Sequence, residues 1–130
     1  MNERALKQTL KAGSIVFGSS AIFLLIAPSV FLSLLSLSHS GQNAWSMRML
    51  GITVFALSGN MAVHALNSTT KALKSVSWVM CVSASALGIC TLSIPVHLTL
   101  FCVVYALVGF GFSFSYAFNL LVAKRTPAKQ

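Results

Sequence analysis

Four polar residues in and just beyond one apolar run are the best placed in this chain to do chemistry. They recur at spacings of seven and four, namely Thr53, Asn60, His64 and Asn67. At 100° per residue they fall within about 60° of arc on one face of a helix. Carboxamides and imidazoles are costly in hydrocarbon unless they are paired. We therefore expect this polar stripe to face other helices, a partner or a ligand rather than lipid.

Three functions are open to the polar stripe. The simplest is hydrogen bonding to serines on the first and third apolar runs, which would hold the helices together. The second is contact with a ligand or a lipid headgroup, and the third is catalysis. Catalysis lacks its usual groups, because Glu3 is the one acidic residue of the chain. General acid–base pairs and proton-coupled transport ordinarily use carboxylates, so the sequence predicts no enzyme.

Three further residues lie in or near the loops on one side of the predicted spans. His39 and His97 are in the first and third loops, and Arg48 begins the second apolar run. Two histidines without a carboxylate or thiolate partner make a weak metal site, so we expect neither a metal nor a cofactor. We expect these residues to contact headgroups or a partner at the outer membrane interface.

The composition places the chain in a membrane. Hydrophobic residues make up 56% of its 130 residues and charged residues only 8%, whereas a soluble domain carries about 25% charged residues. The net charge is +8, but the basic residues lie at the ends of the apolar runs. Nucleic-acid binders carry theirs clustered on one face or along a helix. The sequence therefore predicts no nucleic-acid partner.

Four apolar runs are long enough to cross a bilayer, which takes about 20 residues. They cover approximately residues 13–38, 46–66, 75–94 and 98–123. Residues 1–12 are expected to form a basic lead-in helix continuous with the first span, and residues 124–130 a basic tail. Pro28 removes a backbone donor inside the first span and should kink it. A cleaved signal peptide is the alternative for this run, but its apolar region would be only about 7–15 residues.

The basic residues predict the orientation of the spans. Eight of the nine lie in the lead-in segment, the second loop and the tail: Arg4, Lys7, Lys11, Lys71, Lys74, Lys124, Arg125 and Lys129. By the positive-inside rule both termini are then cytoplasmic, close to anionic headgroups. The predicted fold is an all-α integral membrane antiparallel four-helix bundle. Its size and charge bias favour a bacterial inner membrane, and a eukaryotic organelle remains open.

The last apolar run carries two kinds of surface. Gly109, Ser113 and Ala117 belong to a row of small residues, which lets membrane helices approach closely. Phe110, Phe114 and Phe118 form an aromatic ridge beside it. We expect the small residues to pack against a helix of the bundle or a partner. The ridge faces either lipid or a partner, because aromatic residues are enriched at protein contacts.

The three cysteines carry no redox motif. Cys81, Cys90 and Cys102 lack the C-x-x-C spacing, and thiols in apolar helices commonly serve as packing residues. A bridge between Cys90 and Cys102, on either side of the turn at Pro95, is the alternative.

Two functions follow from these observations. The first is a non-catalytic integral membrane subunit or accessory protein that packs against a larger membrane protein complex, with a membrane-protein partner or further copies of itself. The alternative is a transporter or binder of small molecules or lipids that acts as an oligomer through Asn60 and His64.

Overall fold

The computed structural model describes residues 2–93, 95 and 97–122, and within them the chain forms five helices. They are α1 (Glu3–Ile26), α2 (Pro28–Leu34), α3 (Gly41–Asn67), α4 (Thr70–Leu92) and α5 (Leu100–Leu121). All except α2 are long and apolar enough to cross a membrane. The predicted all-helical fold with four long apolar helices is confirmed. The predicted tail, 124–130, lies outside the described residues.

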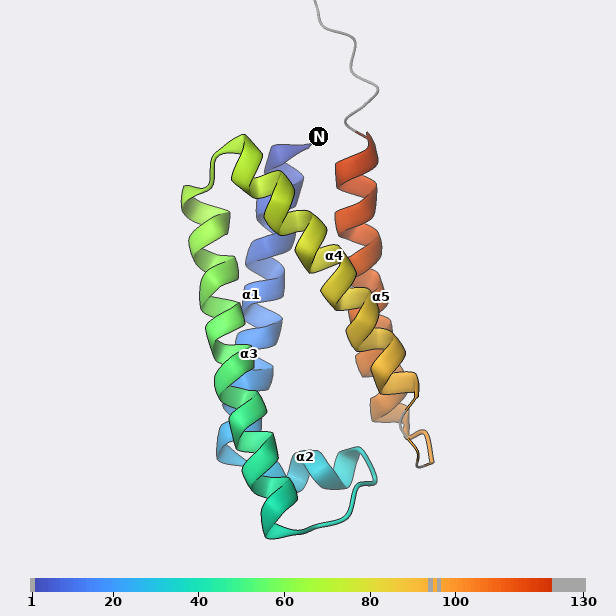
Figure 1. Cartoon of the computed structure of the whole chain (residues 1–130). Coiled ribbons are helices and arrows are strands. Elements are labelled where there is room, and N and C mark those ends of the chain that lie inside the picture. The colour runs from blue at the N-terminus through green and yellow to red at the C-terminus, as the bar shows by residue number, and fades with distance from the viewer. Residues whose placement is uncertain (1, 94, 96, 123–130) are drawn as a thin grey trace, which may run out of the picture.

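The long helices form two pairs. In Figure 1, α3 folds back along α1, and α5 folds back along α4. Contacts are extensive within each pair and sparse between α3 and α4, which diverge from the loop that joins them. The start of α1 and the end of α5 lie at the same end of the molecule (Figure 1), where the Asn2 amide donates to the Asn119 carbonyl at 3.3 Å.

Polar residues begin three of the long helices. The side chains of Asn2, Ser40 and Thr99 accept hydrogen bonds from backbone amides in the first turns of α1, α3 and α5. These caps satisfy donors that a helix leaves free at its N-terminus. They place the helix starts at polar segments of the chain.

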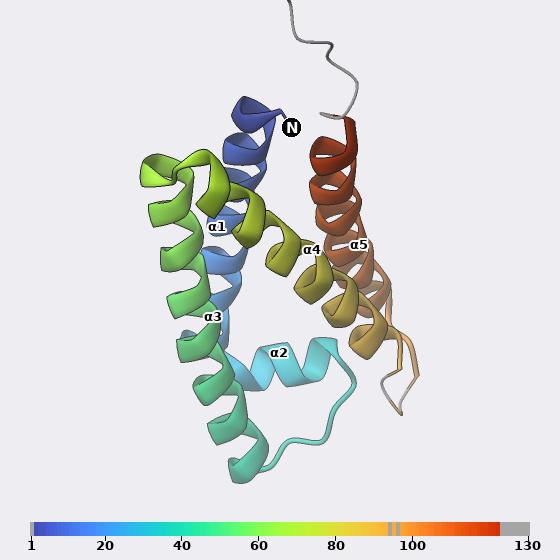
Figure 2. The same cartoon turned by 45° about the horizontal axis from the view of Figure 1, so that its top comes forward.

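Pro28 breaks the first predicted span instead of only kinking it. The sequence predicts one kinked span over residues 13–38, whereas α1 ends at Ile26 and α2 begins at Pro28. The residue before a proline is disfavoured in the α region, and Ala27 accordingly adopts φ −130° and ψ 58°. Pro28 then occupies the first turn of α2, where a missing amide hydrogen is tolerated. Figure 2 shows α2 lying across the molecule rather than along α1.

A residue with a left-handed backbone conformation, Ser36, follows the end of the helix α2. The Leu37 amide donates to the Leu32 carbonyl at 2.9 Å and the Ser36 amide to the Ser33 carbonyl at 3.0 Å. This is the Schellman pattern, in which the residue after the C-cap has positive φ and is usually glycine. Ser36 has φ 56°. It is the only non-glycine residue with positive φ in the described chain.

Reciprocal serine bonds join α1 to α3. The Ser14 hydroxyl donates to the Ser58 carbonyl at 2.9 Å, and the Ser58 hydroxyl donates to the Ser14 carbonyl at 2.8 Å. Gly18 faces Ser58, and a Cβ built there would lie 2.9 Å from the Ser58 hydroxyl oxygen. Small residues therefore bring these two helices close enough for side chains to bond across the interface.

Small residues also join α4 to α5. The Ser113 hydroxyl donates to the Cys81 carbonyl at 3.0 Å and lies 2.6 Å from the Ser85 hydroxyl. A Cβ built on Gly109 would lie 3.1 Å from the Ala84 carbonyl oxygen, and the Phe110 ring covers Gly88. Gly109 and Ser113 of the row of small residues on α5 thus pack against α4.

Candidate functional site

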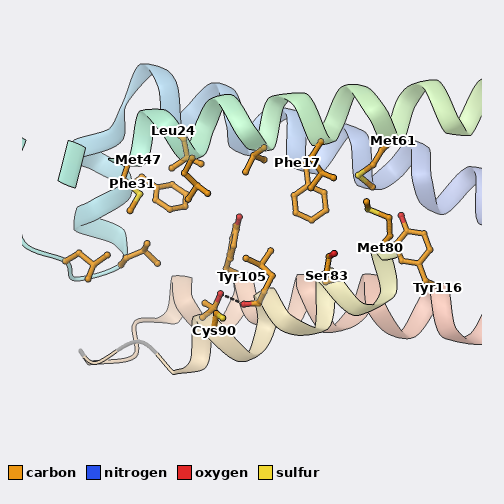
Figure 3. A pocket seen from close by; sticks show the side chains of 18 residues that line it. Phe17, Leu24, Phe31, Met47, Met61, Met80, Ser83, Cys90, Tyr105 and Tyr116 are labelled. Carbon is orange, nitrogen blue, oxygen red and sulfur yellow. Dashed lines mark hydrogen bonds between the residues drawn. The ribbon is translucent and has the colours of Figure 1, made fainter. Parts of the chain in front are cut away.

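An apolar pocket of about 380 Å³ lies between the two helix pairs. Its wall receives side chains from all five helices, and Figure 3 shows the α1–α3 and α4–α5 sides facing each other across it. The labelled side chains include Phe17, Phe31, Met47, Met61 and Met80. Small-molecule binding sites in proteins typically have volumes of about 300–1,000 Å³ and mostly apolar walls, and this pocket has both properties.

An aromatic cluster closes the pocket at the end where α2 lies. The Phe31 ring packs edge-on against Phe101 at 5.6 Å and against Tyr105 at 6.2 Å between ring centroids. The Thr99 hydroxyl donates to the Leu34 carbonyl at 2.7 Å. These contacts connect α2 to the start of α5, so that α2 bridges the two helix pairs.

Tyr116 lies at the opposite end of the pocket. It is 1% exposed, and its hydroxyl has no hydrogen-bond partner among the described residues. In Figure 3 the hydroxyl points from α5 toward the facing helices. A Cβ built on Gly13 of α1 would lie 3.4 Å from this oxygen.

The polar stripe lies on a different part of α3 from the pocket. Thr53, Asn60 and Asn67 are exposed and His64 is partly buried. The pocket is instead lined by Met47, Leu50, Val54, Leu57 and Met61 of the same helix. One face of α3 therefore lies toward the pocket and α1. The face that carries the polar stripe is left uncovered by the described part of the chain.

The hydrogen bonds of the polar stripe are local, which corrects the expectation of bonds to serines on the first and third spans. The Thr53 hydroxyl bonds to the Met49 and Leu50 carbonyls. Asn60 Nδ2 donates to the Ala56 carbonyl at 3.0 Å, and His64 Nδ1 lies 2.7 Å from the Ser68 hydroxyl. On α1, Ser14 pairs with Ser58 on the opposite side of α3, and the Ser19 hydroxyl donates to the Ile15 carbonyl of its own helix.

The residues expected at the outer interface are exposed. His39 and His97 lie in the loops at the end opposite the start of α1, and Arg48 lies two turns inside α3. His39 Nε2 is 3.0 Å from the Ser33 hydroxyl. Among the described residues no three histidine, cysteine or acidic side chains come together as a metal site.

The aromatic residues of α5 separate into inward and outward groups. Tyr116 is buried and Phe112 packs against Phe17 of α1 at 6.1 Å. Phe114 and Phe118 are 71% and 54% exposed and stack on each other at 6.1 Å. Phe110 covers Gly88, and Ala117 is partly buried. Phe110 is itself 36% exposed, so all three residues of the aromatic ridge have exposed surface, with the larger exposed fractions at Phe114 and Phe118.

All three cysteines are free, so the alternative of a Cys90–Cys102 bridge does not hold. Cys81 and Cys102 are buried, whereas Cys90 is exposed and lines the pocket. The sequence offered no signal for the pocket, because its residues come from separate segments and resemble ordinary packing residues. The sequence likewise does not distinguish Tyr116 from the other aromatic residues of α5.

The fold and pocket define a small helical protein with four helices capable of crossing a membrane and an apolar cavity between two helix pairs. No protein family, curated protein or solved structure matches the chain.

Proposed function

We propose that this protein is a non-catalytic integral membrane subunit that packs against a larger membrane protein complex through the uncovered face of α3. The observation that carries the proposal is the exposed Asn60 carboxamide within the long apolar helix α3. The chain has one carboxylate, at Glu3 on the exposed start of α1. Because a single exposed carboxylate forms no acid–base pair, the proposed role is in assembly rather than in acid–base chemistry.

The position of Asn60 along α3 supports a location within the hydrocarbon layer. The helix has 27 residues, which corresponds to about 40 Å at 1.5 Å per residue, whereas the hydrocarbon core is about 30 Å thick. Asn60 lies seven residues, or about 10 Å, from the end of the helix. A carboxamide facing lipid there would lack partners for part of its hydrogen-bonding capacity. A partner helix would supply them.

The surroundings of Asn60 suit close approach of a second helix. Ala56 and Gly59 are also exposed, and a Cβ built on Gly59 would meet nothing within 4 Å. Small residues beside a polar one are typical of interfaces between membrane helices. Thr53 and Asn67 would extend the same contact along α3.

The proposed orientation has both termini in the cytoplasm and the long helices as an antiparallel four-helix bundle. Basic residues of α1 and of the start of α4 support it, because positive-inside charge sets topology. They would contact anionic headgroups of a bacterial inner membrane. His39, Arg48 and His97 would then lie toward the outer interface.

The alternative is a binder or transporter acting as an oligomer through Asn60 and His64. Neither residue lines the pocket between the helix pairs, so this geometry favours a helix contact over a ligand site at the stripe. Further copies of the chain remain possible occupants of the α3 face.

Affinity purification in a mild detergent, followed by native mass spectrometry, tests the subunit proposal. Wild-type protein should retain a membrane-protein partner at fixed stoichiometry. Asn60→Leu and Gly59→Leu should release it, while Gly111→Leu, at an equally open glycine on α5, should keep it. A lone chain in every gentle condition would refute the proposal, and loss only in Gly111→Leu would place the contact on α5.

A further inference from the structure

We propose that the pocket between the helix pairs binds the acyl chain of a membrane lipid, and that the Tyr116 hydroxyl donates a hydrogen bond to the ester carbonyl of that lipid. This site is separate from the α3 face assigned to a partner helix. It goes beyond the subunit proposal and does not depend on it.

The pocket is lined by residues of both α3 and α4, which diverge from each other along its length. The two helices diverge from the loop at Ser68 and Thr69, and few of their residues approach each other beyond it (Figure 2). In the proposed membrane setting, the side of the protein between these two helices faces hydrocarbon rather than water. A lipid chain would reach the pocket directly from the membrane.

The shape of the pocket suits a long chain. Its lining on α3 extends from Met61 to Met47, a distance of about 21 Å along the helix. One leaflet occupies about half of the roughly 30 Å hydrocarbon core. An engineered apolar cavity of about 150 Å³ holds benzene, so about 380 Å³ has room for a much longer apolar group.

The walls suit an apolar occupant of variable shape. Met47, Met61 and Met80 come from both sides of the pocket, and methionine side chains adapt to irregular surfaces. The Thr91 hydroxyl donates to the Leu87 carbonyl at 2.8 Å and therefore does not require a partner from the ligand. The walls contain no charged side chain among the residues that line them.

Tyr116 is the second observation that points to a ligand. Its hydroxyl is buried at one end of the pocket without a partner among the described residues, which is unfavourable for a polar group. Ser77 also has an unpartnered hydroxyl, but a serine in a helix can rotate to donate to the carbonyl four residues earlier. The phenol of Tyr116 extends away from its own helix and lacks this option.

The position of Tyr116 along α5 gives the direction of the lipid. It lies five residues before Leu121, about 7–8 Å from the end of the helix. A lipid whose carbonyl accepts from this hydroxyl would have its polar part toward the end of α5 and the start of α1. Its chain would extend along the pocket toward α2, where Phe31 closes the opposite end.

Photolabelling in phosphatidylcholine vesicles tests the location. The probe is a trace of phosphatidylcholine with a photoreactive acyl chain, and labelled peptides are identified by mass spectrometry. Labelling should concentrate on the segments around Met61 and Met80. Leu87→Trp, which fills the pocket, should reduce it at least five-fold. Val82→Trp, at a 63% exposed position of the same helix, should leave it unchanged. Equal labelling of both variants, or labelling spread over exposed positions, would overturn the proposal.

A pair of probes tests the hydrogen bond. Wild-type protein should label about two- to ten-fold more with the ester-linked probe than with an ether-linked probe that lacks the carbonyl, as expected for one hydrogen bond. This preference should disappear in Tyr116→Phe. Equal labelling of the wild type by both probes would overturn the role of Tyr116. Because the variant removes only one oxygen, it gives a result even if Leu87→Trp does not fold. Displacement of both probes by free fatty acid, but not by added diacyl lipid, would overturn the assignment to a membrane lipid.

Discussion

Two glycines on α5 provide a matched test of how closely α4 and α5 pack. A Cβ built on Gly109 would lie 3.1 Å from the Ala84 carbonyl oxygen and 3.4 Å from the Gly88 amide nitrogen. A Cβ built on Gly111, two residues later, would meet nothing within 4 Å. Gly109→Ala and Gly111→Ala therefore make the same chemical change in one helix, once inside the interface and once outside it.

The expected magnitude comes from the difference between the two variants. Replacing glycine by alanine inside a helix favours the helix by up to about 1 kcal/mol, and this gain applies to both positions. Inserting a methyl group into a close-packed interface costs about 1–3 kcal/mol. The Ala84 carbonyl belongs to the backbone of α4, so it can move only with the helix. Gly109→Ala should therefore be about 1–3 kcal/mol less stable than Gly111→Ala.

Reversible unfolding in mixed micelles, followed by circular dichroism, measures this difference. Gly111→Ala should be as stable as the wild type or slightly more stable, and Gly109→Ala should unfold at a lower fraction of denaturing detergent. Phe110 lies between Gly109 and Gly111 in the sequence, and its ring covers Gly88 of α4. It is unchanged in both variants. If the two variants have the same free energy of unfolding, then α4 and α5 are not packed as closely as the distances at Gly109 indicate.

Two further predictions concern α2 and the cysteines. Ser36→Gly should raise the free energy of unfolding by about 1 kcal/mol, because Ser36 has positive φ (56°) and glycine adopts this conformation without a Cβ penalty. The mixed-micelle assay measures this change. A loss of stability would contradict the Schellman turn. In the folded protein, a small maleimide should modify Cys90 alone, because Cys81 and Cys102 are buried, so intact-mass analysis should show one adduct that Cys90→Ala abolishes. Rapid addition of two or three adducts would show that the α4–α5 interface opens.

The sequence was sufficient to predict the number and type of the main elements. Runs of about 20 apolar residues can satisfy their backbone in lipid only as helices or closed barrels, so four long helices followed from composition and length. Small residues on α5 indicated a packing face, and Gly109 and Ser113 do contact α4. These features depend on local sequence and on helical periodicity.

The structure around Pro28 and the pocket could not be predicted in this way. A proline inside an apolar run permits either a kink or a break, and the break depends on Phe31 and Thr99 forming contacts with distant segments. The pocket arises where the two helix pairs diverge, which is a property of their crossing geometry. Neither feature has a signature in one segment of the chain.

The polar stripe shows how periodicity can identify a face without identifying what it contacts. The cost of burying a carboxamide in hydrocarbon predicts that Asn60 faces something other than lipid, and serines of the first and third apolar runs are the simplest of the expected partners. Ser14 and Ser58 instead pair with each other through both hydroxyls and both carbonyls, which uses the polar groups of the α1–α3 interface. Asn60 is left with a bond to its own helix, at Ala56. Because Ser14 and Ser58 bond to each other without the stripe, we expect the partner of Asn60 to belong to another molecule. That is the physical reason for proposing a partner helix at this face of α3.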